Sequence, residues 1–114
     1  MNLFIPAIGT RLRLNKPWQF PLHDEHRNRA FWAEMAPNAS APSKHAWDPP
    51  TGGILNLTLP AGTLLSVDRL YIRKGQSGFD SITFRVLKGS AIPTGRFWAK
   101  LDDVNKGLDI TIIP

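Results

Sequence analysis

At 114 residues and 42% hydrophobic content, the chain is long enough for one globular domain with its own core, which we expect to span residues 1–114. The lack of cysteine excludes disulfide bonds, thiol catalysis and cysteine-ligated zinc. Fourteen basic residues against nine acidic ones give a net charge of +5, which favours a partner with acidic groups such as nucleic acid.

No segment has the run of ~20 apolar residues that crosses a bilayer. Residues 1–14 lack the basic start and long apolar segment of a signal peptide. We therefore expect an intracellular protein, in the cytoplasm of its own cell or of a host cell, with no membrane partner.

The first half of the chain predicts one strand, a further extended segment at residues 18–20, one helix and one long loop. Residues 9–14 alternate leucine with arginine, which is typical of a strand with one buried face. Residues 24–35 predict a short helix that Asp24 caps, with Phe31 and Met35 on one side. Residues 36–53 are rich in proline and lack periodicity, which predicts a surface loop.

The second half is dense in short alternating segments. They predict strands at 54–59, 64–73, 79–86, 96–101 and 108–113. The apolar phase slips near Asp68, where Leu65 and Val67 give way to Leu70 and Ile72, so we expect a β-bulge there. Residues 102–105, DDVN, predict a short helical turn before the last strand.

Five to six short strands predict a mainly β fold, either a small barrel or a sandwich, with one short helix near the N-terminus. The order of a strand, a helical turn at DDVN and a final strand resembles the end of an SH3-like barrel. This resemblance is one of topology and implies a small barrel. An OB-like barrel is the alternative.

The densest polar cluster is HDEH, which runs from His23 through Asp24 and Glu25 to His26. Such groups can bind a metal or act as acid and base, but a metal site needs further ligands, and His45 is the only other imidazole. No serine lies in the setting of a catalytic nucleophile. A helix start explains the cluster better, so we expect no metal, no cofactor and no enzyme activity.

The strongest functional signal is a set of basic residues at outward-facing strand positions, with aromatic residues between them. Arginine and lysine neutralise phosphates, and aromatic rings stack on bases, as in barrel proteins that bind nucleic acid. Trp98 is either exposed for such stacking or covered by another element. The predicted contact residues are Arg69, Tyr71, Arg73, Arg85, Arg96, Trp98 and Lys100.

A protein-interaction module is the alternative. Trp32, Met35 and Trp47, together with the proline-rich loop, contain residue types that dominate protein interfaces. The protein would then be a small inhibitor or adaptor that binds a larger complex, of the kind that phages and mobile elements encode. On either reading, the chain is a binding module and its partner is a macromolecule.

Overall fold

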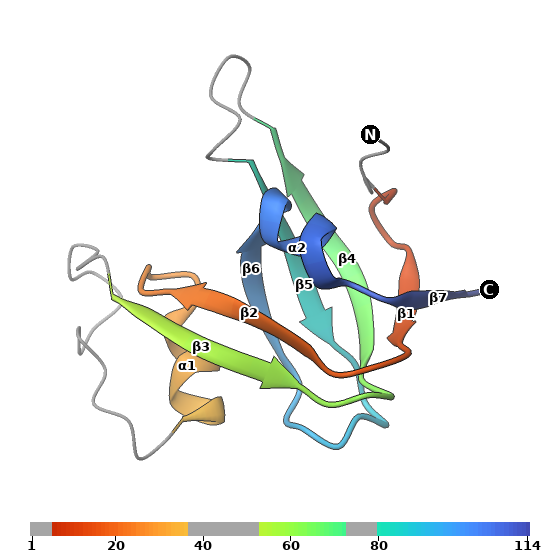
Figure 1. Ribbon diagram of the computed structural model, residues 1–114, viewed down its shortest axis with the longest axis horizontal. Coiled ribbons are helices and arrows are strands. Elements are labelled where there is room, and N and C mark those ends of the chain that lie inside the picture. Colours follow the sequence, from red (N-terminus) through yellow and green to blue (C-terminus); the bar gives the residue numbers. More distant parts are fainter. Residues whose placement is uncertain (1–5, 37–52, 73–79) are drawn as a thin grey trace.

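The computed structural model describes residues 6–36, 53–72 and 80–114 (Figure 1). Two helices lie in these ranges, α1 at Arg29–Met35 and α2 at Leu101–Gly107. The strands are β1 Arg11–Leu14, β2 Trp18–His23, β3 Ile54–Leu59, β4 Leu64–Tyr71, β5 Ser81–Val86, β6 Gly95–Lys100 and β7 Ile110–Ile113.

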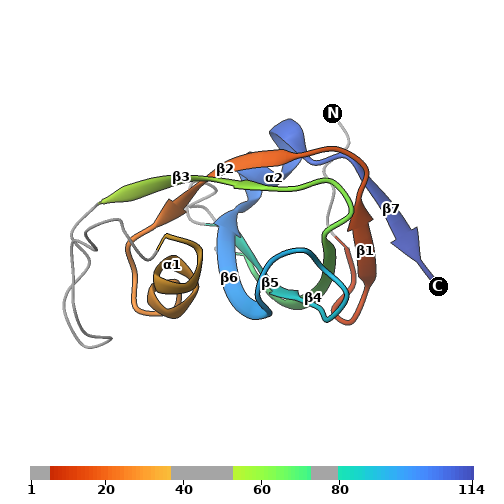
Figure 2. The same ribbon diagram turned by 90° about the horizontal axis from the view of Figure 1, so that it is seen from below.

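The strands form two antiparallel sheets. The larger sheet has the order β6-β5-β4-β1-β7, and β2 pairs with β3 alone. Figure 2 shows the β2–β3 pair as a layer that lies across the curved larger sheet, with α1 beside β6. The fold is therefore mainly β, as predicted. The sheets do not close into a barrel within the described residues, and the SH3-like resemblance is not confirmed.

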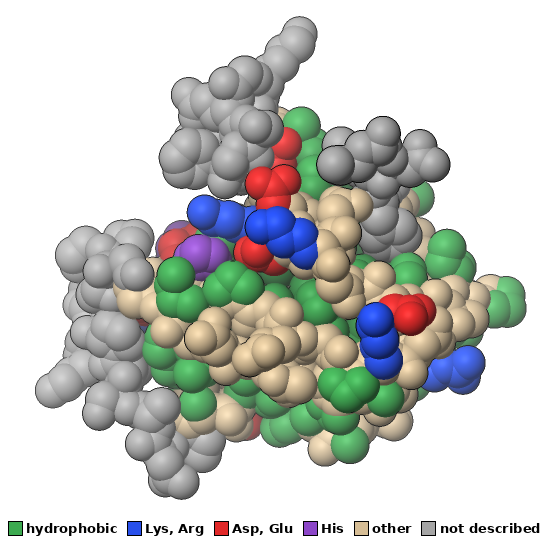
Figure 3. Space-filling view, in the orientation of Figure 1, with side chains coloured by type: hydrophobic (Ala, Val, Ile, Leu, Met, Phe, Trp, Pro, Cys, Tyr) green, Lys and Arg blue, Asp and Glu red, His purple; other side chains and the backbone are tan. Residues whose placement is uncertain are grey.

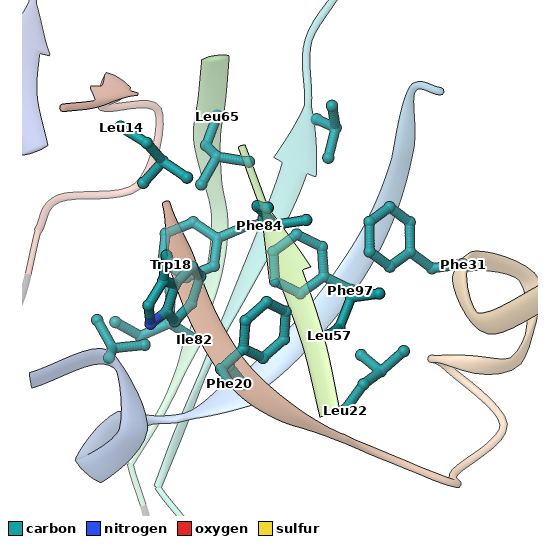
Figure 4. Close-up of a cluster of buried hydrophobic side chains, with 14 of the residues drawn as sticks. Leu14, Trp18, Phe20, Leu22, Phe31, Leu57, Leu65, Ile82, Phe84 and Phe97 are labelled. Carbon is teal, nitrogen blue, oxygen red and sulfur yellow. The ribbon is translucent and has the colours of Figure 1, made fainter. Parts of the chain in front are cut away.

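The core fills the space between the two layers (Figure 4). Trp18 and Phe20 of β2 stack with ring centroids 4.2 Å apart, and Phe20 stacks on Phe97 of β6 at 5.2 Å. Phe31 of α1 closes one end of this cluster by stacking on Phe97 at 4.8 Å. Each buried ring of this kind contributes about 2–3 kcal/mol through the removal of apolar surface from water.

The alternating patterns place the strands well, and the exceptions have local causes. The bulge is confirmed, because the register between β4 and β5 shifts between Val67 and Arg69. The predicted strand at 64–73 ends at Tyr71, and Ile72 is 53% exposed, not buried as predicted. β2 continues through Pro21, which the sheet tolerates because β3 is the only strand of the described ranges that pairs with β2.

The helix predictions need correction. α1 begins at Arg29, five residues after Asp24, and Asn28 occupies the N-cap position. The segment before it forms a turn in which the Asn28 N–H donates to the Glu25 carbonyl at 2.8 Å. Asp24 is buried and pairs with Arg29 at 3.3 Å, so its carboxylate is not a helix cap.

The DDVN segment is a full second helix, so the described chain has two helices and not one. Asp102 and Asp103 lie in the first turn of α2 and Lys106 in the last, where each charge is favourable to the helix dipole. Neither helix in the described ranges has the length and apolar content needed to span a membrane.

Candidate functional site

The outer face of β4, β5 and β6 brings together most of the residues that the sequence selected. Strand register sets them in three rows that cross the sheet. These rows are Tyr71–Ser81–Lys100, Arg69–Thr83–Trp98 and Ser66–Arg85–Arg96. Six of the seven predicted contact residues therefore share one face. The seventh, Arg73, lies outside the described residues.

Two grooves open on this face because the central strand carries small side chains. Ser81 and Thr83 of β5 lie between longer side chains of β4 and β6. The first hollow, of about 560 Å³, contains Tyr71, Ser81 and Lys100, and we name it the Tyr71 groove. The second, of about 410 Å³, is lined by arginines, and we name it the arginine groove. Arg27 and Trp98 border both grooves.

Trp98 is covered, which resolves the alternatives that the sequence left open. The His23 ring stacks on it with centroids 5.3 Å apart and an interplanar angle of 1°. The Arg27 guanidinium lies over the indole, 5.4 Å from its centroid, in cation–π geometry. Trp98 is thus only partly exposed and separates the two grooves. Tyr71, which is 45% exposed, is the more accessible aromatic ring of this face.

The charges of the arginine groove are only partly balanced. It is lined by four arginines, which are Arg27, Arg69, Arg85 and Arg96. The Asp68 carboxylate, at the bulge in β4, lies 2.8 Å from Nε of Arg96 and 3.6 Å from Nη2 of Arg85. The Nε–H of Arg27 donates to the Glu25 carboxylate at 2.8 Å. No carboxylate in the described ranges forms an ion pair with Arg69.

Glu25 is ionised at neutral pH. Burial raises its pKa, but hydrogen bonds from the Arg27 side chain and backbone outweigh burial, so that the pKa lies below its ordinary value. The two carboxylates at the site therefore leave a net positive charge on the groove walls. The surface over β2 and β3 differs, since it shows hydrophobic side chains and few charged ones (Figure 3).

The four residues of the HDEH cluster do not converge on one point. His23 stacks on Trp98, and Asp24 turns inward to Arg29. Glu25 binds Arg27, and its Oε1 lies 2.7 Å from Nδ1 of His26. No group of three histidine, aspartate or glutamate side chains converges on a metal position in the residues described, which do not include His45.

The alternative protein-binding patch does not assemble in the described residues. Trp32 is 5% exposed and belongs to the core, and Met35 is half-buried against that core. Trp47 lies outside the described residues. Trp32 is therefore not available to a partner, because its ring is buried in the core together with Phe31.

Sequence reasoning missed Arg27, Glu25 and Asp68 as parts of the site. Arg27 and Glu25 reach the outer face through a turn, where no periodicity shows which way a side chain points. Asp68 was recognised as the bulge position, and a bulge turns a side chain toward a new neighbour. No protein-family model matches this chain, and no curated protein or solved structure matches it either.

Proposed function

We propose that the protein is a non-enzymatic binding module and that the outer face of β4, β5 and β6 binds the phosphate backbone of a nucleic acid. The observation that carries this proposal is the arginine groove. Four guanidinium groups border one hollow, and Asp68 and Glu25 are the carboxylates that pair with them. A phosphate in this groove would neutralise the remaining charge.

The ion pairs of the groove leave donors for a ligand. A guanidinium has five N–H donors in a fixed plane, and only some of them face a carboxylate. Asp68 meets Nε of Arg96 and Nη2 of Arg85, so it orients both groups while their other N–H bonds stay available to phosphate oxygens. Arg69 adds a guanidinium that no ion pair holds among the described residues.

The basic face continues onto β1. In the sheet β1 lies next to β4, with Arg11 opposite Ser66 and Arg13 opposite Leu64. Both arginines are exposed, while Leu12 and Leu14, which alternate with them, are buried. A polyanion that crosses the strands can therefore meet positive charge from β6 to β1. Contacts of this kind read the backbone, so we expect weak sequence preference.

Fluorescence anisotropy with labelled single- and double-stranded DNA and RNA tests the proposal, with titrations at about 50 and 200 mM salt. Binding should weaken steeply as salt increases. Arg69→Gln should lower the slope of log K against log salt by about 1, because one phosphate contact is lost. Lys16→Gln removes the same charge from the turn between β1 and β2, which borders neither groove, and should leave the slope unchanged.

Two results would overturn the proposal. One is the absence of binding at the lower salt concentration for all four nucleic acids. The other is an equal loss for Arg69→Gln and Lys16→Gln, which would show that affinity depends on net charge and not on this face.

A further inference from the structure

We infer that the Tyr71 groove takes one unpaired base, so that the partner is a single-stranded nucleic acid whose adjacent phosphate lies in the arginine groove. This inference rests on the proposed function and makes it more specific. It follows from the shape of the first groove, from the groups on its walls and from the border that it shares with the second.

The walls of the Tyr71 groove are far enough apart for a planar ring. Tyr71 and Lys100 lie in one row of the sheet with Ser81 between them. Neighbouring strands are about 4.8 Å apart, so the two side chains start from backbones about 10 Å apart. Ser81 is buried and small, and so forms a floor that does not fill this gap. The exposed part of the Tyr71 ring then offers a stacking surface at one wall.

The other groups of the groove suit a base more than a second phosphate. Glu25 places a carboxylate there, which repels a second phosphate, and both of its oxygens are held by Arg27 and His26. The Ser81 hydroxyl and the His26 imidazole also lie at the groove and can donate or accept. The arginine groove, in contrast, is rich in guanidinium groups, which bind phosphate well.

Because the two grooves share a border, one nucleotide can place its base in the Tyr71 groove and its phosphate in the arginine groove. Arg27 and Trp98 line both grooves, so a base and the phosphate next to it would lie on either side of this pair. A base inside a duplex would have to leave its stack to enter the groove, at a cost that a single strand largely avoids. The arrangement therefore favours single strands over duplexes.

The experiment compares three labelled probes of about 12 nucleotides, within the site size of small single-strand binders. The probes are oligothymidylate, an abasic strand with the same number of phosphates, and a duplex. We expect oligothymidylate to bind about tenfold more tightly than the abasic strand or the duplex. Tyr71→Ala should lose this advantage and leave abasic-strand binding unchanged, whereas Tyr71→Phe should keep it. Thermal unfolding checks that both variants are folded.

The outcomes separate this inference from the proposed function. If the abasic strand binds as tightly as oligothymidylate, phosphate binding stands and the base site is wrong. Equal binding of the duplex, or an equal loss of oligothymidylate binding in Tyr71→Ala and Tyr71→Phe, likewise contradicts the base site. If no probe binds at about 50 mM salt, the proposed function fails and the inference fails with it.

Discussion

Asn28 holds the backbone of Trp98 with both ends of its side-chain amide. The Trp98 N–H donates to Oδ1 at 2.8 Å, and Nδ2 donates to the Trp98 carbonyl at 3.2 Å. The same Nδ2 donates to the His23 carbonyl at 3.1 Å. Trp98 lies on β6, at one end of the five-stranded sheet, so the fully buried Asn28 supplies bonds that a further strand would otherwise make. This clamp also fixes the turn that carries Glu25 and Arg27 against the outer face.

Replacing Asn28 with alanine should destabilise the fold by about 2–4 kcal/mol, because it leaves the half-buried N–H and carbonyl of Trp98 without their partner. Urea unfolding followed by tryptophan fluorescence measures the change. Asn56→Ala on the exposed surface of β3 is the matched control and should change the free energy of unfolding by less than about 0.5 kcal/mol. A loss below about 1 kcal/mol for Asn28→Ala would contradict the prediction, because it would mean that other groups satisfy the Trp98 backbone without Asn28.

Two glycines should respond to alanine in opposite directions. Gly62 has a φ of +87°, a left-handed conformation, so Gly62→Ala should cost about 1–2 kcal/mol although no atom lies within 4 Å of the added Cβ. Gly107 ends α2 without a positive φ, and a Cβ there would meet Trp18 at 3.7 Å, an ordinary contact. Gly107→Ala should therefore stabilise by about 0.5 kcal/mol. Chemical denaturation of both variants tests this, and a change of the same sign in both would contradict it.

The sequence was a good guide wherever burial alternates along a strand. Leu12 and Leu14 point inward and Arg11 and Arg13 outward, as their spacing predicts, and the phase slip at Asp68 marks a real bulge. The same alternation places six of the predicted contact residues on the outer face of β4, β5 and β6. The helix start was misplaced because Asp24 has the residue type of a cap but is buried against Arg29.

The grooves could not be predicted, because they depend on contacts between distant segments. Arg27 reaches Trp98 only because Asn28 anchors the preceding turn to β6. The position of Asp68 between two arginines depends on the bulge geometry and on the register of β5 and β6 together. Alternation gives the face on which a side chain lies, but not the charge partner that it finds there.

His23 should make stability depend on pH. Burial lowers its pKa from the ordinary 6.5, nearby Lys100 lowers it further, and Asp103 opposes this in part. In the described part of the chain its Nε2 is buried without a hydrogen-bond partner. The unfolded chain therefore binds the proton first as the pH falls. The free energy of unfolding should have its full value above pH 6.5. It should decrease as the pH falls from 6.5 to the lowered pKa of His23 in the folded state.

Urea unfolding of the wild type and of His23→Phe, between about pH 7.5 and 5, measures this dependence. The variant keeps a ring for stacking on Trp98 but cannot titrate, so its stability should be flatter across this window. Glu25 does not interfere, because its lowered pKa confines its effect to pH values below the ordinary 4.5. His26→Gln changes an exposed imidazole and is the control. A wild type whose stability is constant over the window would contradict the prediction.

Asp68→Asn should increase nucleic-acid affinity, since it removes the one carboxylate among the described residues that Arg85 and Arg96 share. If phosphates bind these arginines, the variant gains a net positive charge at the site, and the slope of log K against log salt should steepen by up to about 1. Asp102→Asn, on the exposed first turn of α2, changes the total charge equally and should have little effect. Anisotropy at about 50 and 200 mM salt compares the two variants. Equal gains would assign binding to the charge of the whole protein, whereas weaker binding by Asp68→Asn would mean that this carboxylate is needed to hold the arginines in place.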